Sequence, residues 1–198
     1  ARAMLPRANT GITKVVEMLG ELGSPMLQHE AALATLQMAK ALDAEDVFLR
    51  TPGVMPNADL LKIAMADVHI QAALRLLDKV DIAFVGVGPA DFHGPLEEGD
   101  NFFSAQQLAD VRSAGAVGQL HQRFIDAAGQ PVKTDLDKLV VGITLEQLRN
   151  ARRKIVVAGG AAKHAAIAAA LAGKWIDVLV TDVNTANYLM NKAPKGKP

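Results

Sequence analysis

The stretch Ile155-Val156-Val157-Ala158-Gly159-Gly160-Ala161-Ala162-Lys163 decides the fold prediction. Its first four residues are all apolar and predict a strand buried on both faces of a sheet. Two glycines then turn the chain, and residues 161–172, which are rich in Ala, predict a helix that packs closely against its neighbours. A buried strand followed directly by a helix is the repeating unit of a parallel sheet.

The same alternation of strand and helix continues on both sides of this stretch. Further buried strands are expected at residues 81–88, 139–143 and 176–180. Helices are expected from Ser104, from Thr144 and from about Asn184, and the pairs Ser104/Gln107 and Thr144/Gln147 have capping-box spacing. The pattern predicts an α/β fold of three α/β/α layers, in which helices cover both faces of a mostly parallel sheet.

The N-terminal part is less uniform. Apolar residues at helical spacing predict a helix over 33–42 and one or two more between Leu60 and Leu77, and residues 47–49 form a short apolar run. Residues 15–22 fit two interpretations, because their apolar positions have helical spacing while 15–20 also has the pattern of a short buried strand ending at a glycine.

A β-hairpin is expected between the helix that begins at Ser104 and the strand at 139–143. Residues 117–125 form its first arm, residues 127–130 its turn, and Pro131-Val132 the start of its second arm. The hairpin is an insertion in the strand–helix scheme.

Composition excludes several classes of protein. The chain has 198 residues, the length of one domain, and its 21 basic and 21 acidic residues give no net charge, unlike most free-standing nucleic-acid-binding domains. It has no Cys, which excludes disulfide scaffolds, Cys zinc sites and thiol nucleophiles. No apolar run reaches the ~18 residues of a membrane span and no signal peptide opens the chain, so we expect a cytoplasmic protein.

The glycine turn of the opening stretch is the first candidate ligand site. Gly159 and Gly160 let a ligand approach the backbone, and Lys163 adds a cation in the first turn of the helix. These features suit a phosphate or carboxylate, although the spacing is not that of a Walker A loop. A tight turn followed by a surface lysine fits the same residues, so both interpretations stay open.

Three other segments near strand ends carry candidate residues. Gly86 and Gly88 turn the chain after one strand, without the third glycine of a dinucleotide-binding fingerprint. Small residues around Gly118 could present Gln119 inward, and Asp182, at the end of the last strand, fits a helix cap as well as a ligand contact. In an open parallel sheet, ligands lie beyond the carboxyl ends of the strands, where these segments meet.

Catalytic and metal-binding patterns are missing from the sequence. The five histidines have no metal-ligand spacing, and there is no Gly-x-Ser-x-Gly elbow. The acidic pair Glu97-Glu98 falls in a loop and is expected to be solvated. We therefore predict no catalytic residue, no metal and no cofactor.

Several segments, in this order and spacing, resemble the sugar-binding (effector) domain of SorC/DeoR-type bacterial transcriptional regulators. The resemblance runs from about Val15 to Leu189 and rests on these stretches: 81–88, 115–118, 144–148, 157–163, 166–167 and 179–182. It implies a fold similar to the sugar-phosphate isomerase and glucosamine-phosphate deaminase fold. It also implies a phosphorylated sugar as effector, assembly into dimers or tetramers, and a strand rather than a helix at Val15 to Gly20.

What the resemblance implies for this chain is a domain that senses a sugar phosphate and modulates operator binding of a longer protein. The implied effector-binding residues are Gly86, Gly88, Gly118, Gln119, Gly159, Gly160, Lys163 and Asp182. Residues 1–191 would be this domain, without its first strand and without the DNA-binding segment, and 192–198 a disordered tail. DNA would be bound only through that segment, and no contact with a membrane is expected.

The chain departs from the family pattern at Gln119, where an acidic residue that contacts sugar hydroxyls is common. An amide can still donate and accept hydrogen bonds. The alternative function is a sugar-phosphate isomerase or deaminase on the same fold. The segment 86–93 has Asp91 and His93 but lacks the Gly-x-Gly-x-Asp-Gly-His spacing of the deaminases, and the isomerases' Asp-Gly-Ala-Asp-Glu is absent. Regulation is therefore the favoured reading.

Overall fold

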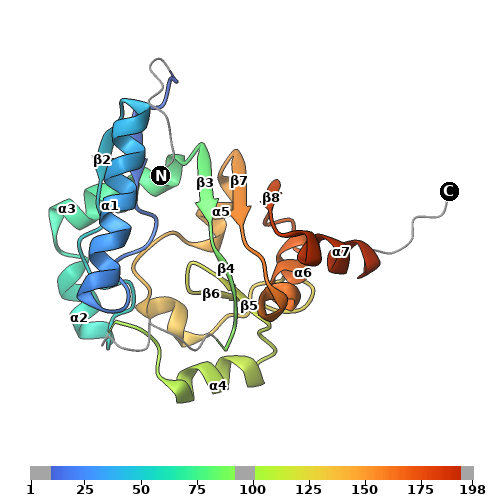
Figure 1. Cartoon of the computed structure of the whole chain (residues 1–198). Helices are drawn as coiled ribbons and strands as arrows, with labels where there is room; N and C mark the ends of the chain where they lie inside the picture. The colour runs from blue at the N-terminus through green and yellow to red at the C-terminus, as the bar shows by residue number, and fades with distance from the viewer. Residues whose placement is uncertain (1–9, 92–100, 193–198) are drawn as a thin grey trace. The chain divides into compact units, whose positions relative to one another are not determined.

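A computed structural model describes the protein over residues 10–91 and 101–192 (Figure 1). The chain forms two compact units. The N-terminal unit consists of residues 1–79, 93–104 and 138–143, and the C-terminal unit of residues 80–92, 105–137 and 144–198. The loop expected at 89–101 and the tail expected at 192–198 fall largely outside the described residues.

The N-terminal unit begins with two parallel strands joined by a long helix. Strand β1 (Lys14–Val16) pairs with β2 (Glu45–Val47), and helix α1 (Pro25–Leu42) connects them. Residues 14–16 are therefore a strand, as the family resemblance implies and against the helical spacing. Two helices follow, α2 (Ala58–Ala64) and α3 (Val68–Leu76), and then a 3-10 turn at Leu77–Lys79.

The core of this unit is built around four buried side chains. They are Leu49, Met55, Ala73 and Val141, and partly buried side chains of α2 and α3 pack against them. Val141 belongs to the segment 139–143, which we expected to be a strand. That prediction is wrong, because the segment makes only isolated antiparallel bridges, from Val140 to Val54 and from Gly142 to Leu19. An apolar run marks burial, and burial alone does not distinguish a strand from an irregular segment.

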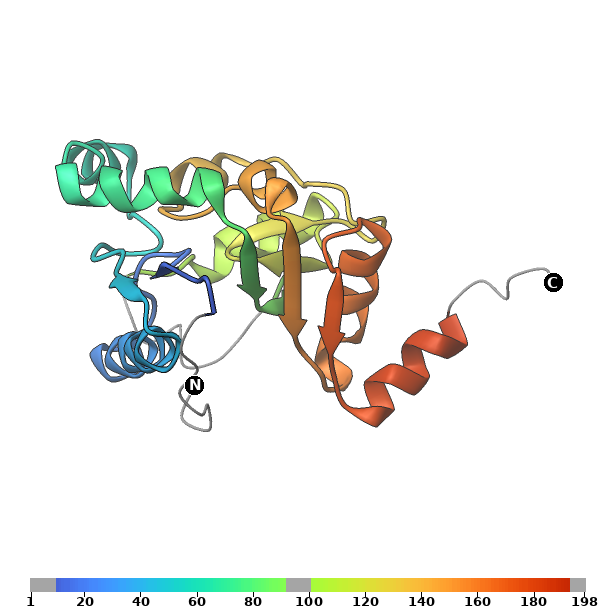
Figure 2. The same cartoon turned by 90° about the horizontal axis from the view of Figure 1, so that it is seen from above.

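The C-terminal unit contains a parallel sheet in the order β3-β7-β8 (Figures 1 and 2). Its strands are β3 (Ile82–Val85), β7 (Arg153–Val157) and β8 (Val178–Val180). A 3-10 turn, η4 (Ala161–Lys163), and helix α6 (His164–Ala172) follow β7, and helix α7 (Val183–Lys192) follows β8. The predicted α/β class with mostly parallel pairing is confirmed.

Helix α5 (Leu145–Asn150) begins with the predicted capping box. The Thr144 side chain accepts a hydrogen bond from the Gln147 backbone, and the Gln147 side chain accepts one from the Thr144 backbone. Helix α4 (Ala105–Ser113) also begins where the sequence predicts. Local capping chemistry therefore located both helix starts.

The inserted hairpin is present, with a turn that the sequence did not reveal. Strands β4 (Val87–Pro89), β5 (Gly118–Leu120) and β6 (Arg123–Ile125) form an antiparallel sheet in that order. The expected first arm, 117–125, is thus split by a two-residue turn at His121 and Gln122, whose φ angles are 48° and 62°. Such turns usually carry Asn or Gly, which explains why the sequence gave no signal. The expected turn at 127–130 also exists, since Ile125 bridges Pro131.

One face of the parallel sheet is exposed, unlike the expectation that helices cover both faces. Four apolar side chains on this face, which we call the open sheet face, are 40–60% exposed: Ile82, Phe84, Val157 and Val180. Their register places them together, because Phe84 aligns with Ile155 and Val157 aligns with Val180. The opposite face holds the buried Ala83, Val85 and Val156.

The single tryptophan joins the hairpin region to the end of α6. Trp175 is 1% exposed, and its indole Nε1 donates a hydrogen bond of 2.7 Å to the carbonyl of Gly129. The Arg149 guanidinium lies over the indole ring, 3.9 Å from its centroid. The buried carbonyl of Gly129 therefore depends on this one side chain for its printed partner.

Trp175→Phe is expected to lower the free energy of unfolding by about 1–3 kcal/mol, because the Gly129 carbonyl is left buried without its donor. Urea denaturation followed by circular dichroism measures the change. Tyr188→Phe is the matched control, since no hydrogen bond of the Tyr188 hydroxyl is found within residues 10–91 and 101–192. Equal midpoints for Trp175→Phe and the unmodified protein would contradict the prediction.

Candidate functional site

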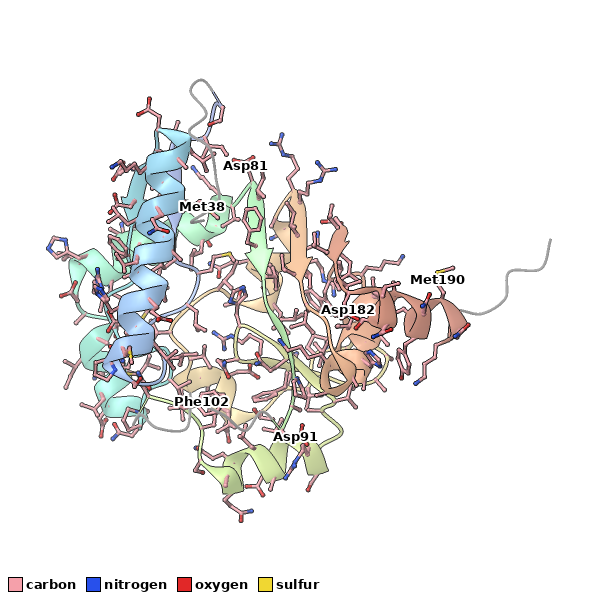
Figure 3. The ribbon with its side chains drawn as sticks, viewed as in Figure 1. Met38, Asp81, Asp91, Phe102, Asp182 and Met190 are labelled. Atoms are coloured by element: carbon pink, nitrogen blue, oxygen red, sulfur yellow. The ribbon has the colours of Figure 1, made fainter. Side chains whose placement is uncertain are left out.

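All eight predicted effector-binding residues lie in the C-terminal unit. Gly86 separates β3 from β4, Gly88 lies in β4, and Gly118 and Gln119 begin β5. Gly159 and Gly160 follow β7, Lys163 ends η4, and Asp182 stands between β8 and α7. Figure 3 shows Asp182 at the end of β8, beside the start of α7.

Gln119 lies over Gly88. The two residues are partners in the β4–β5 ladder, and a Cβ added at Gly88 would lie 3.0 Å from the Gln119 Nε2. The side-chain oxygen of Gln119 accepts a hydrogen bond of 2.9 Å from the backbone of Gln122. Its Nε2 has no acceptor among the described residues, so this half-buried amide keeps its donors available for a ligand.

A close approach at Gly118 holds β5 against α6. A Cβ at Gly118 would lie 2.8 Å from the Cβ of Ala166 and 2.9 Å from its Cα, distances at which real side chains clash. Strand β4 also packs against both α6 and η4. The predicted residues of β4, β5 and η4 are thus gathered at the start of α6.

Lys163 presents an unpaired cation at this place. Its backbone N–H closes the 3-10 turn onto the carbonyl of Gly160 at 3.0 Å. Its ammonium has no hydrogen-bond or ion-pair partner within residues 10–91 and 101–192, and the side chain is half-buried. The backbone N–H groups of Ala161 and Ala162, just before it, also have no acceptor in the described part of the chain. A cation beside free N–H groups suits an anionic ligand.

Asp182 is occupied by the fold. One carboxylate oxygen accepts hydrogen bonds from the Gly160 backbone at 2.8 Å and from the Thr185 hydroxyl at 2.7 Å. The other accepts the Thr185 backbone N–H at 2.9 Å. These bonds, those from Thr185 first, lower the pKa of Asp182 to about 2, so it is ionised at neutral pH. Of the two roles that the sequence left open for Asp182, the structure shows the helix cap.

The same bonds define what Gly160 does. Its φ of 92° lies in the region that favours glycine, and its N–H points to Asp182 and Thr185. This N–H is therefore engaged, and an anion near Lys163 would use the N–H groups that follow it. Gly159 is equally constrained, because a Cβ there would lie 2.2 Å from the Asp182 carboxylate.

Thr185 and His164 complete the arrangement, and sequence reasoning missed both. Thr185 is fully buried, and its one hydroxyl proton goes to the ionised Asp182. The hydroxyl oxygen therefore accepts from the Gly160 N–H and from His164 Nε2, 3.2 Å away, which assigns the ring proton of His164 to Nε2. The His164 ring stacks on Tyr188 with centroids 4.1 Å apart. The Asp-x-x-Thr spacing of a helix cap was the available signal for Thr185.

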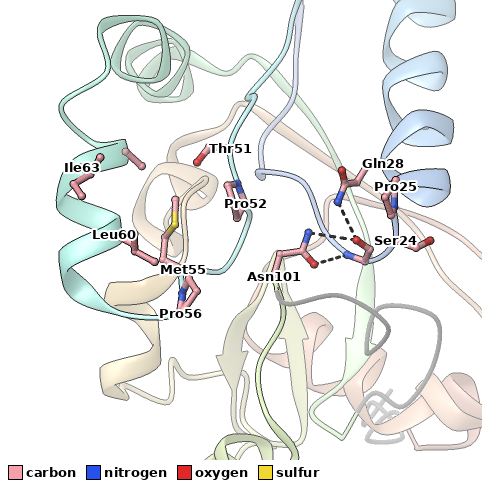
Figure 4. Close-up of a pocket in the computed structure, with 12 residues that line it drawn as sticks. Ser24, Pro25, Gln28, Thr51, Pro52, Met55, Pro56, Leu60, Ile63 and Asn101 are labelled. Carbon is pink, nitrogen blue, oxygen red and sulfur yellow. Dashed lines mark hydrogen bonds between the residues drawn. The ribbon is translucent and has the colours of Figure 1, made fainter.

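A cavity in the N-terminal unit is the second candidate site, and no sequence signal pointed to it. It has a volume of about 580 Å³ and is lined by twelve residues from the start of α1, the segment after β2, α2 and Asn101 (Figure 4). Asn101 fixes one wall, because its amide accepts from the Gly23 N–H at 2.8 Å and donates to the carbonyl of Glu21 at 3.1 Å.

The described residues offer no metal-binding cluster. No group of three or more His, Asp or Glu side chains in residues 10–91 and 101–192 could hold a metal ion. His121, in the β5–β6 turn, is buried, and this burial together with the charge of Arg123 lowers its pKa to about 4. The ring is therefore uncharged at neutral pH. His93, Glu97 and Glu98 lie outside the described residues. No helix in the described part of the chain has the length and apolarity of a membrane span.

Comparison with known proteins assigns the chain to a family. The model of the family described as "Putative sugar-binding domain" matches residues 1–191. The chain is 32% identical over 192 residues to the uncharacterized transcriptional regulator YjhU of Escherichia coli and 30% identical over 191 residues to the deoxyribonucleoside regulator of Bacillus subtilis. Each match covers 96% of this chain but only 57% and 60% of the relative.

The fold is shared with solved regulators. The full-length sorbitol operon regulator SorC of Klebsiella pneumoniae matches with a TM-score of 0.80 and 24% identity, over 94% of this chain and 60% of that one. The chain therefore belongs to the sugar-binding domain family of SorC/DeoR-type bacterial transcriptional regulators. Its relatives regulate transcription and are not enzymes, which decides against the isomerase or deaminase alternative.

Two glycines of the candidate site are expected to respond differently to substitution. Gly118→Ala should lower the free energy of unfolding by about 1–3 kcal/mol, because the new methyl group overlaps Ala166. Gly86→Ala should change it by less than about 1 kcal/mol, because nothing lies within 4 Å of a Cβ there. Thermal or urea unfolding of the two variants measures the difference. Equal stability of both would mean that the β5–α6 contact is looser than described.

Proposed function

We propose that this domain binds a phosphorylated sugar, with the phosphate against Lys163 and the sugar hydroxyls against Gln119. The observation that carries the proposal is the unpaired Lys163 ammonium at the start of α6, next to the free N–H groups of Ala161 and Ala162. A phosphate there would gain charge-assisted hydrogen bonds from the side chain and the backbone. Membership of the sugar-binding family supports a sugar as the rest of the ligand.

Gln119 fits the hydroxyl-binding role. Its Nε2 donors are free within the described residues, and its oxygen is held by Gln122, so the amide orientation is set before a ligand arrives. Gly88 beneath it leaves room, since any side chain there would crowd the amide. A hydroxyl of the sugar would accept from Nε2 in this position.

The proposed domain comprises residues 1–191 and acts within a longer regulator in the bacterial cytoplasm. DNA would be bound by a segment outside this chain, since the net charge here is zero. Bound sugar phosphate would shift the population of assembled states and thereby change operator affinity. The shift is limited by the difference in ligand affinity between those states.

Lys163→Ala should weaken binding of the sugar phosphate about ten- to hundredfold, because a hydrogen bond to a charged group is lost. The ligand is first selected by a thermal-shift screen of phosphorylated and free sugars, since a ligand that binds only the native state raises stability. Isothermal titration calorimetry on the selected sugar phosphate then compares the variants.

Lys133→Ala is the matched control, because Lys133 is an exposed lysine of the same unit and also lacks a partner in the described residues. It should bind like the unmodified protein, whereas Gln119→Ala should weaken phosphorylated and free sugars alike. Unchanged affinity of Lys163→Ala would show that the Gly-Gly-x-x-Lys segment is only a turn.

We also propose that the chain forms a homodimer or homotetramer. The open sheet face supports this proposal, since Ile82, Phe84, Val157 and Val180 together expose a large apolar area to water.

Sedimentation at micromolar concentration should show a dimer or larger species, and Phe84→Ser should shift it toward the monomer. Phe84 is 51% exposed, so its loss removes little core packing. Val68→Ser, at an apolar position of α3 that is 68% exposed, is the control and should leave the assembly unchanged. A monomeric unmodified protein would refute the proposal.

A further inference from the structure

The cavity of the N-terminal unit differs chemically from the Lys163 site. None of its twelve lining residues is charged: Gly23, Ser24, Pro25, Gln28, Thr51, Pro52, Met55, Pro56, Leu60, Ile63, Ala64 and Asn101. Transferring a charged group from water into such surroundings is costly unless an opposite charge pairs with it. The lining therefore favours an uncharged occupant over a phosphate or a carboxylate.

Three polar groups of the lining have unused hydrogen-bonding capacity. Thr51 is only 5% exposed, yet its hydroxyl has no hydrogen-bond partner within residues 10–91 and 101–192. The Ser24 side chain precedes α1 but does not cap it. The Gln28 amide donates to the carbonyl of Gly23 at 2.9 Å, which leaves its oxygen as an acceptor. A buried hydroxyl without a partner is rare in folded proteins and suits a ligand oxygen.

The rest of the lining is apolar and only partly covered. Met55 is buried in the core, whereas Leu60 is 45% exposed and Ile63 is 69% exposed at the rim. Covering exposed apolar side chains with a carbon skeleton releases water and stabilises the complex. A volume of about 580 Å³, mostly apolar walls and a few polar groups are the usual features of a small-molecule site.

The walls are held in place before any ligand binds. Asn101 and Gln28 converge on Gly23 from two different segments, as the dashed lines in Figure 4 show. Met55 is anchored by its backbone hydrogen bond of 2.8 Å to the carbonyl of Leu139 and by its packing against Leu49 and Val141. A prearranged site loses less entropy on binding than one that must be ordered.

We propose that this cavity binds a small uncharged molecule with an apolar carbon chain and neighbouring hydroxyl or carbonyl groups. Its oxygens hydrogen-bond to Thr51 and Ser24, and its chain lies on Met55, Leu60 and Ile63. This is a second site, with a ligand class different from the phosphorylated sugar proposed for Lys163. The two can be tested independently because they share no residue.

The test uses methyl NMR of the chain labelled with 13C at its methionine methyl groups. The chain has seven methionines, of which Met55 lines the cavity and Met190 lies on α7, 75% exposed. The probes are 1,2-hexanediol, which is uncharged, and hexanoate, its charged counterpart. We expect a saturable shift of the Met55 signal with 1,2-hexanediol, no shift of Met190, and at least about tenfold weaker binding of hexanoate.

Two variants tie the signal to the residues named. Thr51→Val keeps the side-chain shape and should weaken 1,2-hexanediol about three- to tenfold through loss of the hydroxyl. Ile63→Ala should weaken it about two- to fivefold without affecting folding, because this side chain is mostly exposed. Thr13→Val, at an exposed position of the same unit, is the matched control and should bind normally.

The proposal is overturned if Met55 shows no saturable shift, or if all methionine signals move together in proportion to the probe. It is also overturned if hexanoate or ribose 5-phosphate binds this cavity more tightly than 1,2-hexanediol. Loss of sugar-phosphate binding in Lys163→Ala, with the Met55 response intact, would leave this proposal standing on its own.

Discussion

The carboxylate of Asp182 is the interaction on which the geometry of the C-terminal unit depends. It joins the turn after β7 to the start of α7, accepting hydrogen bonds from Gly160 and from both the backbone and the hydroxyl of Thr185. Because the charge is shared by three donors, the carboxylate stays ionised and the bonds are strong ones. This clamp fixes the direction in which the chain leaves Gly160, and so the place where Lys163 stands.

The clamp also separates structural roles from binding roles within one short motif. Gly159 and Gly160 serve the fold, the first by leaving space for Asp182 and the second by its positive φ and its engaged N–H. Lys163 has no such duty among the described residues. A motif that suggests anion binding as a whole is thus divided, with the rigid part holding the cation in position.

The predictions that failed share a physical cause. Residues 139–143 are as apolar as a buried strand, yet their partners are the segments around Leu19 and Val54, which are themselves irregular. Strand formation needs a neighbour with a continuous ladder, and no local pattern shows whether one exists. In the same way, the tight turn at His121 and Gln122 is imposed by the pairing of β5 with β6, against the preferences of both residues.

The sequence by itself determined what depends on neighbours along the chain. The Ile155–Ala158 run, the two glycines and the Ala-rich helix predicted the β7–α6 unit, the Thr144/Gln147 spacing predicted a helix start, and the ordered motifs predicted the family. These features are local because caps, turns and periodicity act over a few residues.

Tertiary structure decided what depends on residues far apart in the sequence. It committed Asp182 to Gly160 and Thr185 as a cap, placed Gln119 over Gly88, and left the hydroxyl of Thr51 without a partner in an uncharged cavity. Asn101 and Gln28 meet at Gly23 across 78 and 5 positions of chain, and only folding brings them there. Hydrogen bonds and packing act over a few ångströms in space, so chain distance carries no information about them.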